Sequence, residues 1–510
     1  MSTVERKKGI FQRFLDGIEK AGNKLPHPVT LFAILAVLVV IISSVVASFG
    51  ILVEDPANPG ETIAVKNLLS GEGISYIFTS MVDNFIGFAP LGVVLATMLG
   101  IGICERSGLI SAGLRGFVLS IPNRLITAGL VFAAVMSSVA SDAGYVVLPP
   151  LGAVIYAALG RHPLAGLATA FAGVSGGFSA NLLLSATDPM LGELTMQAAA
   201  TIDPAYAEQM NNAMNYWFII VSTILITIVG TIVSEKIVEP RLGTYKGDYT
   251  GDLERLKPIE KKGMLYAGIA LAISAALISL LIVPEWGPMR GTGDQPIVVS
   301  PFMDSLVVII LLLFLIPGLV YGIVTKNIKS DKDVAKQMTD TMASMGMFIV
   351  LAFTAGQFVA YFSESNLGLF LGILGGEMLT SLNLDGIPVV IGFIIITAFI
   401  NLFVGSASAK WAMMAPVFVP IMMQIGYSPE LAQATYRVAD SATNIITPLM
   451  TYFAIVIAFA QKYDKNMGIG TLISVMLPFS IWFLISWSLL LIVWIFTGLP
   501  LGPNAPIYMP

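Results

Sequence analysis

The stretch VGSASAKWAMMAPVFVPIMMQIGYSPELAQATYRVADSATNIITP, residues 404–448, places polar side chains between long apolar runs. Its polar residues include two serines, a lysine and an arginine with an aspartate: Ser406, Ser408, Lys410, Arg437 and Asp440. A polar group inside a membrane costs several kcal/mol unless it has a partner, so polarity at this depth is normally functional. The stretch therefore predicts a functional site inside a membrane protein.

The composition of the whole chain is that of a polytopic helical membrane protein. Of its 510 residues, 56% are hydrophobic and 12% are charged, and the mean hydropathy is +0.84. Soluble chains carry about 25% charged residues. Cys104 is the single cysteine, which excludes internal disulfides and thiolate metal clusters. Two histidines are too few for a multi-histidine metal site.

Basic and acidic loops alternate along the chain and predict its topology. Residues 1–28 form a basic amphipathic N-terminus, and the linker 236–263 and the loop 326–336 are also rich in Lys and Arg. The loops that follow residue 53 and that cover 200–214 are acidic. Because basic loops stay in the cytoplasm, we expect a cytoplasmic N-terminus, about nine spans plus two re-entrant hairpins, and an external C-terminus.

The chain divides into two halves of similar design. We expect each half to contain a hairpin and then a broken helix: residues 29–235 with hairpin 125–159 and broken helix 164–199, and residues 264–510 with hairpin 386–426 and broken helix 430–460. Placing 138–181 on 405–447 with one gap aligns Pro149 with Pro416, Gly160 with Gly426, and Pro163 with Pro429. Charge puts the first turn inside and the second outside, which predicts an inverted-topology repeat with its site near the midplane.

Hairpin tips and helix breaks predict cation sites, one in each half. Broken helices free backbone carbonyls, and these together with Ser, Thr and Asn oxygens suit Na⁺, while half-helix N-termini suit an anionic substrate group. The candidate Na⁺ ligands are Ser137, Ser138, Ser141, Asp142 and Asn181 in the first half, and Ser406, Ser408, Thr443 and Thr447 in the second. We expect no cofactor beyond a coupling Na⁺, and no nucleic-acid partner.

Five separate motifs lie at the expected hairpins and helix breaks: SDAGYVVLPPLGA (141–153), GRHPLAGL (160–167), SANLLLSATDPML (179–191), SASAKWAMMAPVFVP (406–420) and YRVADSATNIITPL (436–449). With these motifs the chain resembles the aminobenzoyl-glutamate transporter (AbgT) family over nearly its whole length. The resemblance implies a homodimer in the bacterial inner membrane, with nine spans and two hairpins in each protomer. It also implies transport of the folate breakdown product p-aminobenzoyl-glutamate, or export of sulfonamide antimetabolites.

The resemblance also implies which residues form the substrate site. Carried over by motif, they are Asp188, Ser408, Trp411, Pro429, Arg437, Asp440 and Pro448. From their positions at the helix breaks we add Asn181 and Asn444.

Four of the charged and aromatic residues have more than one interpretation. Asp188 is either a membrane-depth carboxylate that takes part in coupling or an external helix cap. Arg437 either holds a substrate carboxylate or forms an i, i+3 ion pair with Asp440. Trp411 either stacks on an aminobenzoyl ring or packs between helices. Lys410 snorkels, pairs with an acid or binds substrate.

The expected function is transport, not catalysis. His27 and His162 both lie near loops, so a hydrolytic dyad with histidine is implausible, and no Walker-type motif supports ATP coupling. We expect a secondary transporter for an aromatic carboxylate, coupled to Na⁺ or H⁺. The alternative is a proton-driven efflux pump for sulfonamide-type antimetabolites. Broken, inverted hairpins favour alternating access over a passive channel.

Overall fold

The computed structural model describes residues 26–54, 62–140, 143–245, 255–292, 297, 300–381, 386–447, 450, 452–465 and 467–510. Within these ranges the regular structure is helical apart from one antiparallel pair of short strands, β1 (Leu52–Glu54) and β2 (Thr62–Ala64), with Val53 opposite Ile63. The predicted fold class, an all-helical polytopic membrane protein, is confirmed.

Seven helical stretches of the described residues are long and apolar enough to cross a membrane. They are α2 (Pro28–Ser48), α3 (Gly71–Ile86) continued by α4 (Pro90–Arg106), α11 (Tyr216–Val233) continued by η4 (Ser234–Val238) and α12 (Glu239–Leu242), α13 (Pro258–Ile282), α15 (Leu306–Val324), α17 (Gly346–Glu364) and α23 (Ile469–Thr497). In α13 only 17% of the apolar window is buried, as expected for a helix that faces lipid. If the bent pair Leu109–Ser120 and Asn123–Val139 counts as one span, the described residues contain eight candidate spans, and the nine expected from the sequence stay a prediction.

The first repeat unit, called unit one, is a hairpin followed by a broken helix. It consists of α6 (Ile126–Met136), η2 (Ser137–Ala140), α7 (Ala143–Ala158), α8 (Pro163–Phe171), η3 (Ala172–Gly176) and α9 (Thr187–Ala199). The segment η3 has π-helical geometry, and residues 177–186 are not helical. Such a bulge before a break leaves backbone groups without their usual helical partners.

The second repeat unit, called unit two, has the same order of elements. It consists of α19 (Ile387–Asn401), α20 (Ala407–Gln424), α21 (Pro429–Asn444) and α22 (Phe453–Ala460). Residues 402–406 form the hairpin tip. The second arm of each hairpin contains two prolines within its helix, at positions 149 and 150 in α7 and at 416 and 420 in α20.

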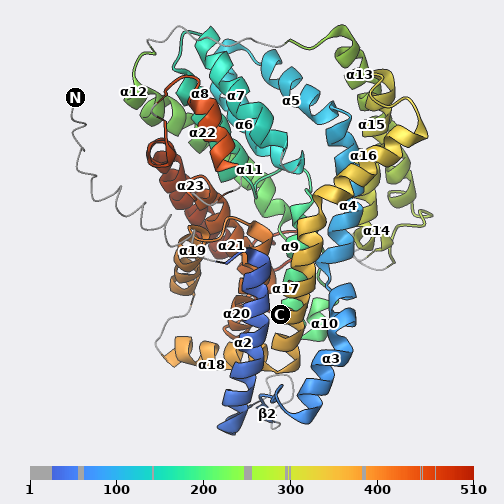
Figure 1. The fold of residues 1–510 in the computed structure, drawn as a ribbon, viewed down its shortest axis with the longest axis vertical. Helices are drawn as coiled ribbons and strands as arrows, with labels where there is room; N and C mark the ends of the chain where they lie inside the picture. Colours follow the sequence, from blue (N-terminus) through green and yellow to red (C-terminus); the bar gives the residue numbers. More distant parts are fainter. Residues whose placement is uncertain are drawn as a thin grey trace.

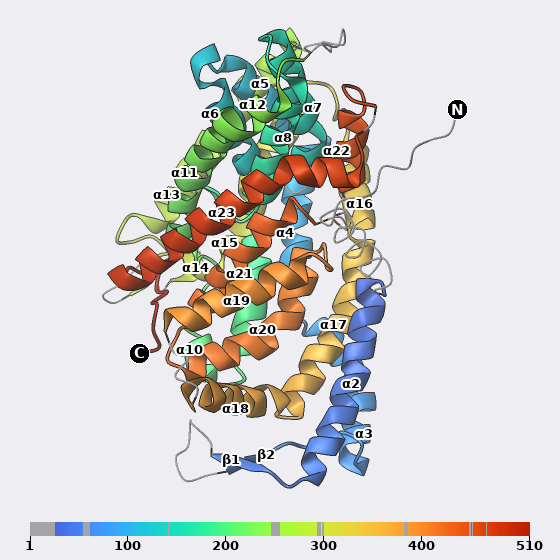
Figure 2. The ribbon, with the colours of Figure 1, turned by 90° about the vertical axis from the view of Figure 1, so that its left-hand side faces the viewer.

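The two units have opposite orientations. In unit one, the turn between α7 and α8 is held by Arg161, whose Nε donates to Glu239 of α12 at 2.8 Å. In unit two, the turn between α20 and α21 is held by the C-terminus, where the Met509 N–H donates to the Gly426 carbonyl at 3.0 Å. Figures 1 and 2 place α12 near one end of the molecule and the C-terminus towards the other.

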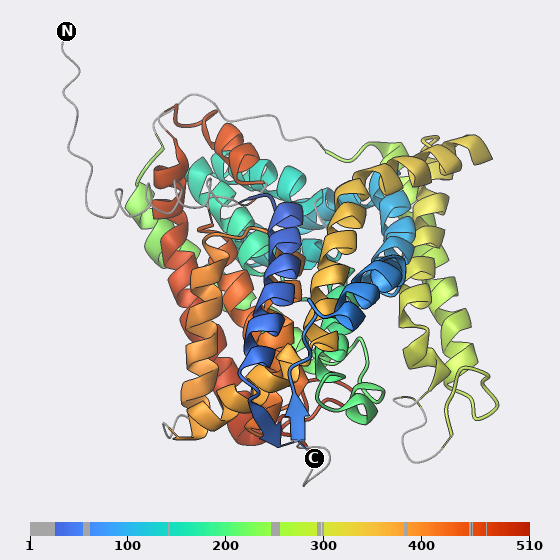
Figure 3. The ribbon, with the colours of Figure 1, turned by 60° about the horizontal axis from the view of Figure 1, so that its bottom comes forward.

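The remaining elements connect and surround the units. They are α5 (Leu109–Ser120), η1 (Asn123–Leu125), α10 (Pro204–Ala207), α14 (Pro301–Asp304), α16 (Asp331–Ser344) and α18 (Leu367–Ser381). We call α4, α13 and α15 the side arm, because α15 packs against both of the others and the three lie on the side of the molecule away from α23 (Figure 3). The chain turns by 111° between α5 and α6, where it passes from the side arm to unit one.

Unit one depends on a close crossing of α7 and α8. A Cβ atom at Gly152 would lie 2.5 Å from the Gly166 carbonyl oxygen, and one at Gly166 would lie 2.1 Å from the Gly152 carbonyl oxygen. Small residues permit such backbone approach, which supplies much of the packing energy between membrane helices.

Gly152→Ala is therefore expected to lower the free energy of unfolding by about 1–3 kcal/mol, the usual cost of overpacking. Gly113→Ala in α5 is the matched control, since nothing lies within 4 Å of its Cβ position and alanine favours a helix. The measurement is thermal unfolding of the purified protein in detergent. Equal melting temperatures for the two variants would contradict the close crossing.

Candidate functional site

A buried ion pair joins the start of α9, directly after the break of unit one, to α21 of unit two. Asp188 lies in the first turn of α9, and its Oδ1 is 2.7 Å from Nη1 of Arg437 on α21. The two side chains are 4% and 2% exposed. The other carboxylate oxygen accepts from the backbone N–H and the hydroxyl of Ser185 at 2.6 and 2.8 Å. Every oxygen of this carboxylate is thus engaged, which a buried charge requires.

Asp188 combines features of both interpretations made from the sequence. It binds the backbone of Ser185 just before α9, as a helix cap does. It is also buried and paired with a charge from the opposite unit, as expected for a carboxylate that takes part in coupling.

The i, i+3 ion pair between Arg437 and Asp440 is not formed. The Asp440 carboxylate instead pairs with the Lys410 ammonium, and both side chains are buried. The two charges of α21 therefore have different partners, Asp188 on α9 and Lys410 on α20. Of the three interpretations of Lys410, pairing with an acid is the one observed.

Asn401, which the sequence analysis did not select, is central to this second ion pair. Its Oδ1 accepts from the Lys410 ammonium. Its Nδ2 donates to the Asp440 carbonyl at 2.7 Å, to Thr443 at 2.7 Å and to Asn444 at 3.0 Å. The only signal in the sequence is one amide at the end of the apolar run IIITAFIN, directly before the hairpin tip.

Trp411 packs between the helices of the two units. Its ring is buried and lies 4.6 Å from that of Tyr436, and its Nε1 donates to Thr195 of α9 at 3.0 Å. Gln433 extends this contact, because it donates to the same Thr195 hydroxyl at 2.8 Å and accepts from Arg437 Nε at 3.1 Å. Thr195 and Gln433 were also missed from the sequence, since neither lies at a break or in a charged pair.

Two of the candidate Na⁺ ligands of unit one, Ser138 and Asn181, contact each other directly. The Asn181 side chain donates through Nδ2 to the Ser138 hydroxyl at 2.9 Å and accepts through Oδ1 from the Leu183 N–H at 3.2 Å. Ser137 and Ser138 donate to backbone carbonyls three residues earlier. Three other predicted site residues lie outside those that the structure describes: Ser141, Asp142 and Pro448.

The hydroxyl groups of unit two lie in two places. Ser406 caps α20 and its Oγ is 3.2 Å from that of Ser408 at the hairpin tip. The Thr443 and Thr447 hydroxyls each donate to the α21 backbone carbonyl four residues earlier. The Thr447 hydroxyl also lies within hydrogen-bond distance of the Asn401 backbone carbonyl, at 3.1 Å. Among the described residues, no group of three or more His, Cys, Asp or Glu side chains is placed to hold a metal.

Pro429 lies at the buried start of α21, in a turn that is firmly held. The preceding Ser428 caps the helix and donates to the Pro506 carbonyl at 2.6 Å. The Tyr206 hydroxyl lies 3.1 Å from both carboxylate oxygens of Glu430. Burial raises the pKa of the Tyr206 phenol, and the neighbouring Glu430 carboxylate raises it further. The contacts around Pro429 thus fix the turn at the start of α21.

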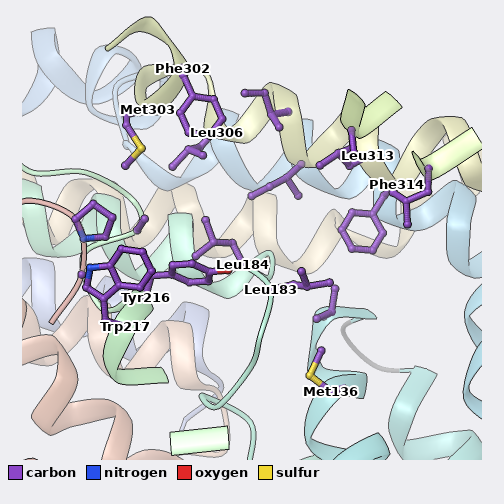
Figure 4. Close-up of a pocket in the computed structure, with 18 of the residues that line it drawn as sticks. Met136, Leu183, Leu184, Tyr216, Trp217, Phe302, Met303, Leu306, Leu313 and Phe314 are labelled. Atoms are coloured by element: carbon purple, nitrogen blue, oxygen red, sulfur yellow. The ribbon is translucent and has the colours of Figure 1, made fainter. Parts of the chain in front are cut away.

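A cavity of about 1390 Å³ lies between the side arm and unit one (Figure 4). Ser137 of the hairpin tip and Leu183 and Leu184 of the α8–α9 break line it, so it adjoins the polar group around Asn181. None of the described residues that line it is charged. Apart from polar residues such as Ser137 and Asn504, its walls are mainly apolar and aromatic, and they include Tyr216, Trp217, Phe302, Leu306 and Phe314. Small-molecule sites have this character, with a few polar groups at one side.

Comparison with known proteins identifies relatives across the whole chain. Residues 13–509 match the AbgT putative transporter family. The chain is 38% identical over 489 residues to the p-aminobenzoyl-glutamate transport protein of Escherichia coli K12, covering 96% of this chain and 95% of that protein.

Two solved structures share the fold. The YdaH transporter of Alcanivorax borkumensis, described as having an unusual topology, is 45% identical with a TM-score of 0.89, covering 94% of this chain and 100% of that one. MtrF of Neisseria gonorrhoeae, described with a class of antimetabolite efflux pumps, is 48% identical with a TM-score of 0.90, covering 97% and 100%. The protein is a multi-pass membrane transporter and not an enzyme, and it belongs to the AbgT family.

Proposed function

We propose that this protein is a secondary active transporter of an aromatic carboxylate such as p-aminobenzoyl-glutamate, coupled to Na⁺ or H⁺, in the bacterial inner membrane. The single observation that carries this proposal is the buried pair of Asp188 and Arg437, which joins the break of unit one to unit two. A charge pair at membrane depth is costly, so it marks a substrate or ion pathway.

Arg437 has the chemistry to hold the carboxylate of the solute. Its guanidinium already binds one carboxylate, that of Asp188, at 2.7 Å, and a planar guanidinium suits a second carboxylate equally well. A solute carboxylate that displaces Asp188 would free that aspartate to take a proton or a cation. When Arg437 exchanges the Asp188 carboxylate for that of the solute, binding of the substrate is thus linked to binding of the coupling ion.

The apolar cavity suits the aromatic part of the same solute. Its wall reaches the α8–α9 break through Leu183 and Leu184, which precede Asp188 by five and four residues. Its volume of about 1390 Å³ exceeds what a single aminobenzoyl group needs, since drug-sized pockets measure roughly 300–1,000 Å³. The ring would lie in the cavity with its acidic end towards Arg437.

Two groups in the site suit a coupling cation. The oxygens of Ser137, Ser138 and Asn181 are the hard ligands that Na⁺ prefers. In unit two the Lys410 ammonium is itself the cation, and it is held by Asn401 and Asp440. The ion pair of Lys410 and Asp440 can exchange a proton. The same chemistry supports the alternative function, proton-driven export of sulfonamide-type antimetabolites, because an uncharged cavity also accepts a neutral aromatic drug.

We further propose a homodimer with a cytoplasmic N-terminus and an external C-terminus. The start of α13, which carries lysines 261 and 262, and the C-terminus lie towards opposite ends of the molecule, and this separation supports the orientation expected from the positive-inside rule (Figure 1).

Uptake of labelled p-aminobenzoyl-glutamate into proteoliposomes tests the function, with Na⁺ and pH gradients varied independently. The expected result is accumulation that collapses with one of the two gradients. Choline replaces Na⁺ at a fixed pH gradient, so indifference to Na⁺ rejects sodium coupling. Absence of uptake under every gradient, with labelled sulfonamide transported instead, would reject the carboxylate substrate in favour of the export function.

A further inference from the structure

Two adjoining cavities lie where unit one meets the start of α13. The first, called the basic pocket, measures about 570 Å³ and is lined by α5, α6 and α7 together with Arg255 and Lys261. The second, called the apolar groove, measures about 390 Å³ and is lined by Phe117, Leu125 and Phe132 with Thr227 of α11. Ser120 and Ile121 belong to both linings, so the two cavities lie next to each other.

The basic pocket has a positive charge that is not neutralised within its lining. Arg255 and Lys261 are exposed, and no acidic residue lines the pocket among those that the structure describes. Glu260, next to Lys261 in sequence, forms its ion pair with Arg115 at 2.6 Å. Neither Arg255 nor Lys261 forms an ion pair with any of the residues that the structure describes.

The position of the cavities matches a membrane interface. Arg255 and Lys261 lie beside the first turn of α13, a membrane-spanning helix, at the end of the molecule that carries the basic linker. The groove extends from there along α6 and α11, and Phe117 and Leu125 at its edge are 43% and 59% exposed. A cationic site at the interface that continues into an apolar groove has the two-part chemistry of a phospholipid.

We propose that the basic pocket and the apolar groove bind one anionic glycerophospholipid. Its phosphate lies between Arg255 and Lys261, its headgroup hydroxyls contact Ser120 and Asn123, and an acyl chain occupies the groove. The lipid touches α5, α6, α7 and the start of α13 at once. It therefore links the hairpin of unit one to the side arm across the 111° turn between α5 and α6.

The test is native mass spectrometry of the purified protein with phosphatidylglycerol, with phosphatidylcholine of the same acyl chains, and with glycerol phosphate as a competitor. Arg255→Gln/Lys261→Gln removes both cations of the pocket. Lys332→Gln/Lys336→Gln, two exposed lysines on α16, makes the same change of charge elsewhere. All four side chains are exposed, so the fold is expected to be kept in both variants.

We expect phosphatidylglycerol to bind more tightly than phosphatidylcholine, and the pocket variant to lose this affinity roughly 10- to 30-fold while the α16 variant keeps it. Equal binding of the two lipids, or unchanged affinity in the pocket variant, would overturn the proposal. Competition by glycerol phosphate at the affinity of the lipid would also overturn it, because the site would then recognise a free phosphate. None of these outcomes depends on the transported solute.

Discussion

Asp188→Asn is expected to abolish transport and to lower the free energy of unfolding by about 3–5 kcal/mol, because the Arg437 guanidinium then stays buried without a counter-charge. Transport is measured as proteoliposome uptake, and stability as thermal unfolding in detergent. Glu193→Gln on the same helix is the control, since Gln keeps the oxygen that accepts from Asn212 at 2.9 Å.

The double variant Asp188→Asn/Arg437→Gln separates stability from function. Removing both charges takes away the unpaired cation, so most of the lost stability is expected to return. Transport is expected to stay absent, because the guanidinium that we assign to the solute carboxylate is gone. Wild-type transport in either variant would remove this ion pair from the proposed site.

Lys410→Met is expected to inactivate transport and to lower the free energy of unfolding by about 3–5 kcal/mol, because it leaves the buried Asp440 carboxylate without its cation. Lys336→Met on the exposed surface of α16 is the matched control and is expected to behave as wild type.

The double variant Lys410→Met/Asp440→Asn distinguishes a coupling role from a structural one. If the pair exchanges the coupling proton, this variant should regain stability and exchange solute across the membrane, yet fail to accumulate it under a pH gradient. Accumulation equal to that of the wild type under a pH gradient would assign the pair a structural role only.

The arrangement of the units was accessible from sequence because it depends on local signals. The matched turns at Gly160 and Gly426 predict the inverted repeat, which agrees with the opposed turns of the structure, whereas the orientation indicated by the loop charges stays a prediction. Polar segments that interrupt apolar segments predict the helix breaks, because a polar segment cannot continue as a lipid-facing helix.

The pairing of charges was not accessible from sequence, because it depends on packing between distant helices. Arg437 and Asp440 are one turn apart on α21, yet they contact α9 and α20 respectively. Asn401 and Gln433 have no distinctive sequence context, and their roles come only from the buried groups around them. The apolar cavity is likewise formed by residues from α4, α5, α11, α13 and α15, which no local pattern connects.

Counterflow tests alternating access most directly. Proteoliposomes loaded with unlabelled p-aminobenzoyl-glutamate are placed in a trace of labelled solute, with no ion gradient. A carrier that binds solute between the two units predicts a transient internal excess of label, which Asp188→Asn abolishes and Glu193→Gln retains. Simple equilibration of label without any excess, in the wild type, would contradict alternating access and indicate a passive channel.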